Sequence, residues 1–149
     1  MSMYKQFKTN PDLEVGGILL EYTDPDGEDF RVTIARAGGA NKKYAKVLEA
    51  RAKPYRRAIQ MEMMDNQRVL LILKRVYAET VVLNWETKNA DDEFVKGIEN
   101  PEGGSLLPVT VDNVEKTFLQ LNDLFLDVKE QAERSVLFRQ TIQEEEAKN

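Results

Sequence analysis

Carboxylates are the main side chains in this sequence that could do acid–base or metal chemistry, because histidine and cysteine are both absent. Without them the chain cannot build a Ser-His-Asp triad, a zinc hydrolase site, a histidine base or a thiolate nucleophile. Only an enzyme that works with carboxylates would remain. We therefore expect a protein that is not an enzyme and that uses no cofactor and no metal, unless one of two acidic groups forms a site.

The first acidic group surrounds Gly27 and consists of Asp24, Asp26, Glu28 and Asp29. Alternate carboxylates around a glycine could supply oxygen ligands to calcium. The spacing does not fit an EF-hand loop, which has a third ligand before its glycine and a glutamate at its end. The better interpretation is an acidic hairpin turn, because Pro25 presets one turn torsion and Gly27 accepts a positive one.

The second acidic group, Asp91-Asp92-Glu93, could hold magnesium or act in general acid–base catalysis. It lies in a stretch rich in Gly, Pro and Asn, and no phosphate-binding glycine pattern accompanies it. Solvated charge on a loop is the favoured interpretation.

A basic segment from Lys42 to Arg57 contains seven lysines and arginines and only one acid, Glu49. Such a face could dock an acidic partner protein, contact nucleic-acid phosphates, or simply be solvated. Nucleic acid is not favoured, because stacking aromatic residues are not interleaved with the charges and the chain has a net charge of -5. The candidate protein-binding residues in this segment are Lys53, Tyr55, Arg56 and Arg57.

Four apolar residues are further candidates for protein binding. Trp85 follows an apolar run and is either a core residue or part of an interface. The C-terminal region carries Phe118, Leu121 and Phe125, and its apolar stripe exceeds what one small domain can readily cover. We expect part of that stripe to face another chain, either a second copy or a client.

The elements that must position these residues form one α+β domain over 1–149 that is mostly helical. An N-terminal β-hairpin region (1–36) has strands at 15–22 and 30–35, because apolar and polar residues alternate in the second strand. Central helices occupy 41–83. The first begins at Asn41, kinks at Pro54 and continues to about Met61. After Asp65, the run 69–83 is apolar nearly all round, which predicts a buried helix.

The remaining residues are expected to form an acidic loop or irregular hairpin at 84–110, with a strand-like stretch at 94–98, followed by C-terminal helices at 111–143. Asp112 or Asn113 is the expected cap, and Asn122-Asp123 interrupts the helical run. The tail 144–149 is expected to fray. No run is long enough for a membrane span and the N-terminus lacks the apolar core of a signal peptide, so we expect no membrane association.

Three stretches resemble the tail assembly chaperones of long-tailed (siphophage-type) bacteriophages. They are Ile34-Ala35-Arg36-Ala37-Gly38, Lys53-Pro54-Tyr55-Arg56-Arg57, and Ala78-Glu79-Thr80-Val81-Val82 leading to Trp85. Their order and spacing carry the resemblance, which extends over most of the chain. None of them is a catalytic motif.

The resemblance implies a non-catalytic chaperone in the host cell cytoplasm. Such a protein binds the tape measure protein, keeps it soluble, recruits tail tube protein and is absent from the mature virion. It also implies a possible homo-oligomer and a longer frameshift product, for which Ala147-Lys148-Asn149 is the candidate slippery site. The alternative from another class is a structural virion component, such as a head–tail connector or a minor tail protein.

Overall fold

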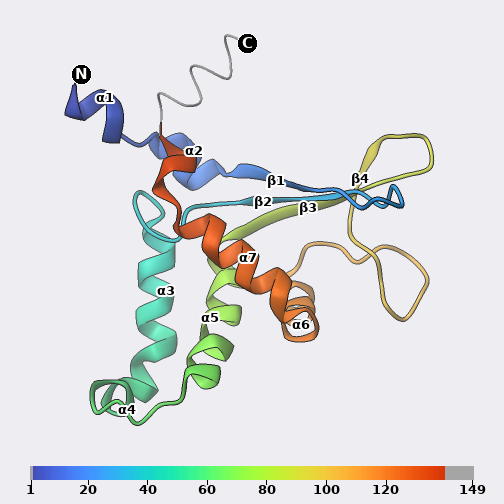
Figure 1. Ribbon diagram of the computed structural model, residues 1–149. Helices are drawn as coiled ribbons and strands as arrows, with labels where there is room; N and C mark the ends of the chain where they lie inside the picture. Colours follow the sequence, from blue (N-terminus) through green and yellow to red (C-terminus); the bar gives the residue numbers. More distant parts are fainter. Residues whose placement is uncertain (1, 140–149) are drawn as a thin grey trace.

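The computed structural model describes residues 2–139 and has an α+β architecture, in which helices pack on one face of a four-stranded antiparallel sheet (Figure 1). The strands lie in the order β1-β2-β3-β4. The strands are β1 (Ile18–Tyr22), β2 (Phe30–Ile34), β3 (Val82–Lys88) and β4 (Phe94–Lys96). The helices are α1 (Met3–Phe7), α2 (Pro11–Gly16), α3 (Lys42–Ala52), η1 (Lys53–Tyr55), α4 (Arg56–Gln60), α5 (Asn66–Thr80), α6 (Val111–Gln120), α7 (Asn122–Glu133) and η2 (Ser135–Phe138).

The N-terminal hairpin is confirmed, with Leu20 opposite Val32 in the β1–β2 register. The prediction that its first strand begins at residue 15 is wrong, because residues 11–16 form α2. The Asn10 side chain caps that helix by accepting the backbone N–H of Asp12 at 3.0 Å. Gly17 ends it at a φ of 96°, where an added Cβ would lie 2.8 Å from Thr33 Cγ2.

The central helix begins and ends earlier than predicted, because α5 starts at Asn66 and ends at Thr80, and Val82 begins strand β3. A continuous apolar run does not distinguish a buried helix from a buried strand, and here pairing with β2 decides it. The prediction of a loop at 84–110 is therefore wrong for residues 84–88, which belong to strand β3. Its alternative, an irregular hairpin, is confirmed by β4 and by an isolated bridge between Ile98 and Leu107.

The helix boundaries follow the predicted signals in three places and depart from them in two. Asp65 caps α5, the chain tightens into a 3-10 turn around Pro54, and a break separates α6 from α7. Thr110, rather than Asp112 or Asn113, caps α6 through its side-chain oxygen. Asn41 starts α3 without a side-chain cap bond. Instead it donates to the carbonyls of Arg36 and Thr80, which ties the hairpin to the end of α5.

The core lies between the sheet and helices α5, α6 and α7. Tyr77 is at its centre and contacts the rings of Tyr44 and Phe125 edge-on, and Phe125 in turn contacts Phe118. The buried face of the sheet adds apolar side chains, including Trp85. The end of the predicted C-terminal helices, the frayed tail and the proposed frameshift site at 147–149 lie outside the described residues.

Candidate functional site

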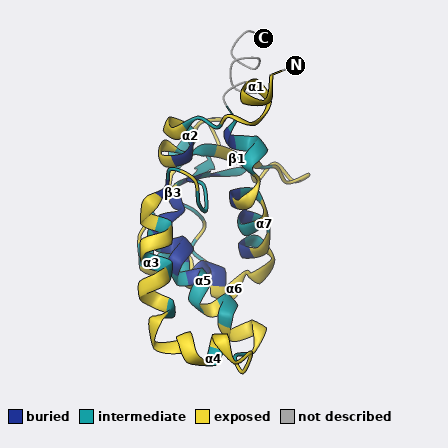
Figure 2. Ribbon diagram, turned by 90° about the vertical axis from the view of Figure 1, so that its left-hand side faces the viewer, coloured by how far each residue is buried: buried dark blue, intermediate teal, exposed yellow. Residues whose placement is uncertain are grey.

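A largely exposed helical part of the described chain is the corner at which α3 turns through η1 and α4 into α5. We call residues 50–72 the helical corner. Figure 1 places α4 at the end of the molecule opposite α1, and Figure 2 shows that α3 and α4 are exposed along most of their length. The basic segment found in the sequence runs along this element, which places its cations on a surface that partners can reach.

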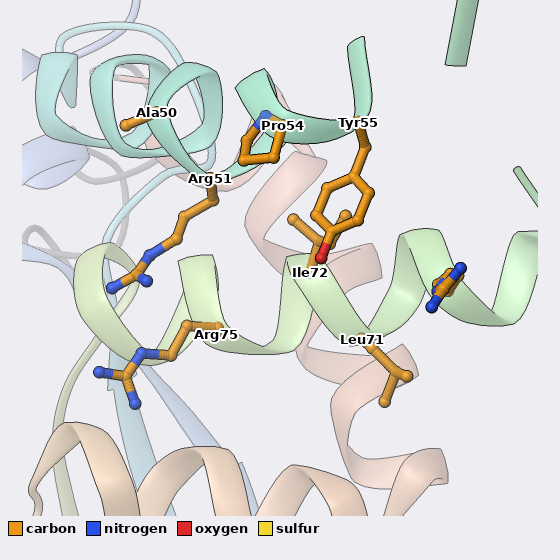
Figure 3. A pocket seen from close by; sticks show the side chains of 8 residues that line it. Ala50, Arg51, Pro54, Tyr55, Leu71, Ile72 and Arg75 are labelled. Carbon is orange, nitrogen blue, oxygen red and sulfur yellow. The ribbon is translucent and has the colours of Figure 1, made fainter. Parts of the chain in front are cut away.

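A groove of about 410 Å³ lies between the end of α3 and the start of α5 (Figure 3). We call it the corner groove. Figure 3 shows Tyr55 and Pro54 on one wall and Ile72 and Leu71 on the other, with Arg51 and Arg75 together at one end. Its lining residues are Ala50, Arg51, Pro54, Tyr55, Arg68, Leu71, Ile72 and Arg75.

One glutamate connects the two helices that form the groove. Glu79 accepts hydrogen bonds from Arg51 on α3 and from Arg75 on its own helix, the latter at 3.3 Å from Nε. The Arg51 hydrogen bond is the main cause that holds the pKa of Glu79 below its usual value, against the opposing effect of burial. Arg75 also reaches Asp112 at 3.0 Å and Glu115 at 3.4 Å on α6. These contacts fix one end of the groove.

Most other cations of the corner form no ion pair among the described residues. Within residues 2–139, Lys53, Arg57 and Arg68 form no ion pair, and Arg56 has only a long contact of 3.6 Å to the exposed Glu49. The corner is therefore positively charged, although the chain as a whole is acidic.

Apolar side chains are exposed beside these cations. Met63 is 74% exposed and Leu71 50%. Tyr55, Ile59 and Met61 are also exposed on the helical corner. Methionine is flexible and polarisable, so it adapts to partner surfaces of different shape. A cluster of this kind, rimmed by charge, is typical of a protein-binding surface.

The structure separates the predicted protein-binding residues into two groups. Lys53, Tyr55, Arg56 and Arg57 are all exposed at the helical corner, and Leu121 is exposed between α6 and α7. The remaining three, Trp85, Phe118 and Phe125, are core residues, each 3% exposed or less. The Trp85 indole N–H also donates to the Leu107 carbonyl at 3.0 Å. The predicted surplus of apolar surface at Phe118 and Phe125 is therefore wrong, because Tyr77 and its neighbours cover these rings.

Sequence reasoning missed Arg68 and Leu71. They lie three residues apart and share a helical face with Arg75. This spacing could have predicted that the two side chains lie on one surface. The prediction was not made, because the apolar run around Arg68 and Leu71 indicated a helix buried on most sides.

The acidic groups serve as turn elements. The Asp24 carboxylate accepts the N–H of Asp26, and that of Asp29 accepts the N–H of Asp24. Asp92 pairs with Lys88 at 3.0 Å. Among residues 2–139, no group of three acidic residues is arranged to hold a metal ion, and no helix is long and apolar enough to cross a membrane.

A second exposed apolar surface lies at the opposite end of the molecule. Helix α1 extends away from the body (Figures 1 and 2), and Met3, Tyr4 and Phe7 are all exposed on it. We call α1 the N-terminal arm. The Phe7 ring is covered in part by the guanidinium group of Arg139, 4.8 Å from the ring centre.

Comparison with known proteins places the chain in a family. No curated protein and no solved structure matches it. A family model described as YdaY prophage protein matches residues 39–149, which is well over half of the chain and includes the whole helical corner. The chain therefore belongs to the YdaY prophage protein family and is derived from a bacteriophage.

Proposed function

We propose that this prophage protein is a non-catalytic tail assembly chaperone. In this proposal it binds the tape measure protein in the host cytoplasm, keeps it soluble, recruits tail tube protein and leaves before the virion is complete. The observation that carries the proposal is the helical corner, which exposes apolar side chains such as Met63 and Leu71 together with cations that form no ion pair within the described residues, such as Arg57 and Arg68.

The chemistry of the corner suits a long helical client. A tape measure protein is long and amphipathic, so it exposes apolar stripes until the tail is assembled around it. Burying one apolar side chain contributes about 1.5–3 kcal/mol, but loss of translational freedom and side-chain ordering offset much of the total. A few such contacts per chaperone give weak binding at each site. Weak, repeated binding shields the client and still allows release.

The two exposed apolar surfaces support the recruiting step of the proposal. The N-terminal arm and the helical corner lie at opposite ends of the molecule (Figure 1), so a client on one leaves the other accessible. The arm would then bind a tail tube subunit or a second copy of the chaperone.

Co-expression with the tape measure protein encoded in the same prophage tests the proposal. The client should move from the insoluble to the soluble fraction and co-purify with the chaperone. A triple variant, Ile59→Gln, Met63→Gln and Leu71→Gln, should lose this effect, whereas Leu126→Gln on α7 is the matched control for an exposed apolar residue. A client that stays insoluble with the wild-type chain would refute the chaperone function.

The alternative, a structural virion component, predicts a different location. Mass spectrometry of purified virions should detect a connector or a minor tail protein in each particle. A chaperone should be absent from mature particles and present in the lysate.

A further inference from the structure

We propose that the corner groove binds an acidic amphipathic helix, with Arg68 pairing with a carboxylate of that helix and Leu71 and Tyr55 packing on its apolar face. This inference rests on the proposed function and specifies the chemistry of the client segment.

The groove is formed before any partner binds. Glu79 joins Arg51 of α3 to Arg75 of α5, and Arg75 continues to Asp112 on α6. This network fixes the spacing of the two helices that form the walls. A binding site that already has its bound geometry loses less conformational entropy when it is occupied, so a modest contact area is sufficient.

The middle of the groove is apolar and open. Pro54 and Tyr55 face Ile72 and Leu71 across it (Figure 3). Both Tyr55 and Leu71 are exposed in the unbound chain. Apolar residues of a helical ligand at i, i+3, i+4 and i+7 form a stripe that fits a groove between two helices.

The charges around the groove select an acidic ligand. Arg68 lines it one helical turn before Leu71 and has no ion pair within residues 2–139, and Lys53 and Arg57 are likewise unpaired on the η1–α4 side. A helix that packs on Leu71 brings its flanking carboxylates to these cations.

Two acids near the rim do not cancel this charge. Asp65 is the cap of α5, where its carboxylate accepts the backbone N–H of Arg68 at 2.9 Å and keeps its negative charge. Glu62 lies on the α4–α5 connection and is a single opposing charge. The rim therefore keeps a net positive charge, because three cations without an ion pair in the described residues (Lys53, Arg57 and Arg68) face two acids.

The same charges disfavour nucleic acid. Glu79, Asp112 and Glu115 already neutralise Arg51 and Arg75, so these two arginines are not free to contact a phosphate backbone. Nucleic-acid binding proteins combine many free cations with stacking aromatic residues, and the groove has one aromatic residue, Tyr55.

Fluorescence anisotropy with three labelled probes tests the inference on the full chain. The first is a synthetic amphipathic helix with leucines on one face and glutamates beside them, the second has lysines in place of the glutamates, and the third is a single-stranded DNA oligonucleotide. The glutamate peptide should bind roughly tenfold or more tightly than the lysine peptide. Its affinity should fall with added salt.

Two substitutions locate the binding site. Arg68→Gln should weaken the glutamate peptide roughly threefold, as expected for one exposed ion pair, and leave the lysine peptide unchanged or tighter. Leu71→Gln should weaken both peptides. Arg134→Gln is the matched control, because Arg134 is exposed and follows α7 on the other side of the fold. Circular dichroism checks that each variant stays folded, and Arg68→Lys should recover part of the affinity.

Equal affinity for the two peptides, tighter binding of DNA, or no effect of Arg68→Gln would overturn the inference. The results also separate it from the proposed function. A client that is solubilised while the glutamate peptide does not bind leaves the chaperone proposal intact and refutes the groove. If the glutamate peptide binds but the client stays insoluble, the groove inference stands and the chaperone proposal is refuted.

Discussion

Replacing Glu79 by glutamine tests the contacts that hold the walls of the corner groove. Glu79 is largely buried and pairs with Arg51 and Arg75, both of which are partly exposed. An exposed ion pair contributes up to about 1 kcal/mol, and the substitution leaves two neighbouring guanidinium groups without their shared counter-charge. We expect Glu79→Gln to lower the free energy of unfolding by about 1–2 kcal/mol. For a chain of this length, that lowers Tm by roughly 3–6 °C.

The effect of Glu79→Gln on stability should depend on pH in a defined direction. The Arg51 hydrogen bond is the largest cause of the lowered pKa of Glu79. A carboxylate whose folded-state pKa is lowered stabilises the fold above its unfolded pKa, near 4.3, and the stabilisation is lost as the pH falls through the folded-state pKa. The difference between wild type and Glu79→Gln should therefore be complete at neutral pH and shrink as the pH falls through the lowered folded-state pKa of Glu79.

Urea unfolding followed by tryptophan fluorescence measures both quantities, because the single tryptophan, Trp85, is buried. Glu130→Gln is the control, since Glu130 is exposed on α7 and has no ion pair within residues 2–139. It should change the free energy of unfolding by less than about 0.5 kcal/mol. A Glu79→Gln variant as stable as wild type at neutral pH, or a difference in stability that does not shrink as the pH is lowered, would refute the reasoning.

Three further substitutions test the fold around the site. Asp65→Ala removes the cap of α5 and should lower the free energy of unfolding by about 1 kcal/mol in urea titrations. Asp65→Ser should retain most of the wild-type stability, because serine also caps helices. Tyr22→Phe removes a hydrogen bond to Asp127 of 2.6 Å and should cost about 1–2 kcal/mol. Burial, followed by Asp127, raises the pKa of Tyr22, so this difference should be complete below about pH 10 and vanish as the pH rises through the folded-state pKa. Phe125→Ala opens a cavity in the aromatic core and should lower the free energy of unfolding by about 3–5 kcal/mol, and a loss below about 1 kcal/mol would contradict its place there.

Local chemistry in the sequence predicted several elements correctly. The turn around Gly27, the tightening at Pro54 and the cap at Asp65 each depend on the torsion or hydrogen bond that one residue type supplies. Strand β3 depends on a distant partner instead. Residues 81 and 82 continue the apolar run of α5, and only pairing with β2 makes the second of them part of a strand.

Only part of the candidate site could be predicted from the sequence. Charge and composition identified the basic segment, and with it Tyr55 and Arg57 on the exposed corner. Arg68 and Leu71 come from a different helix, and tertiary contacts through Glu79 bring them to the same groove. Tertiary contacts also explain the wrong prediction for Phe125. The sequence placed it on a partner-binding stripe, but packing against Tyr77 buries it.

Amide hydrogen exchange on the co-purified complex with the tape measure protein tests the central claim most directly. If the helical corner holds the client, residues 53–64 and the first two turns of α5 should exchange more slowly in the complex than in the free chain. Unchanged exchange over these residues, with protection elsewhere in the chain, would contradict the account.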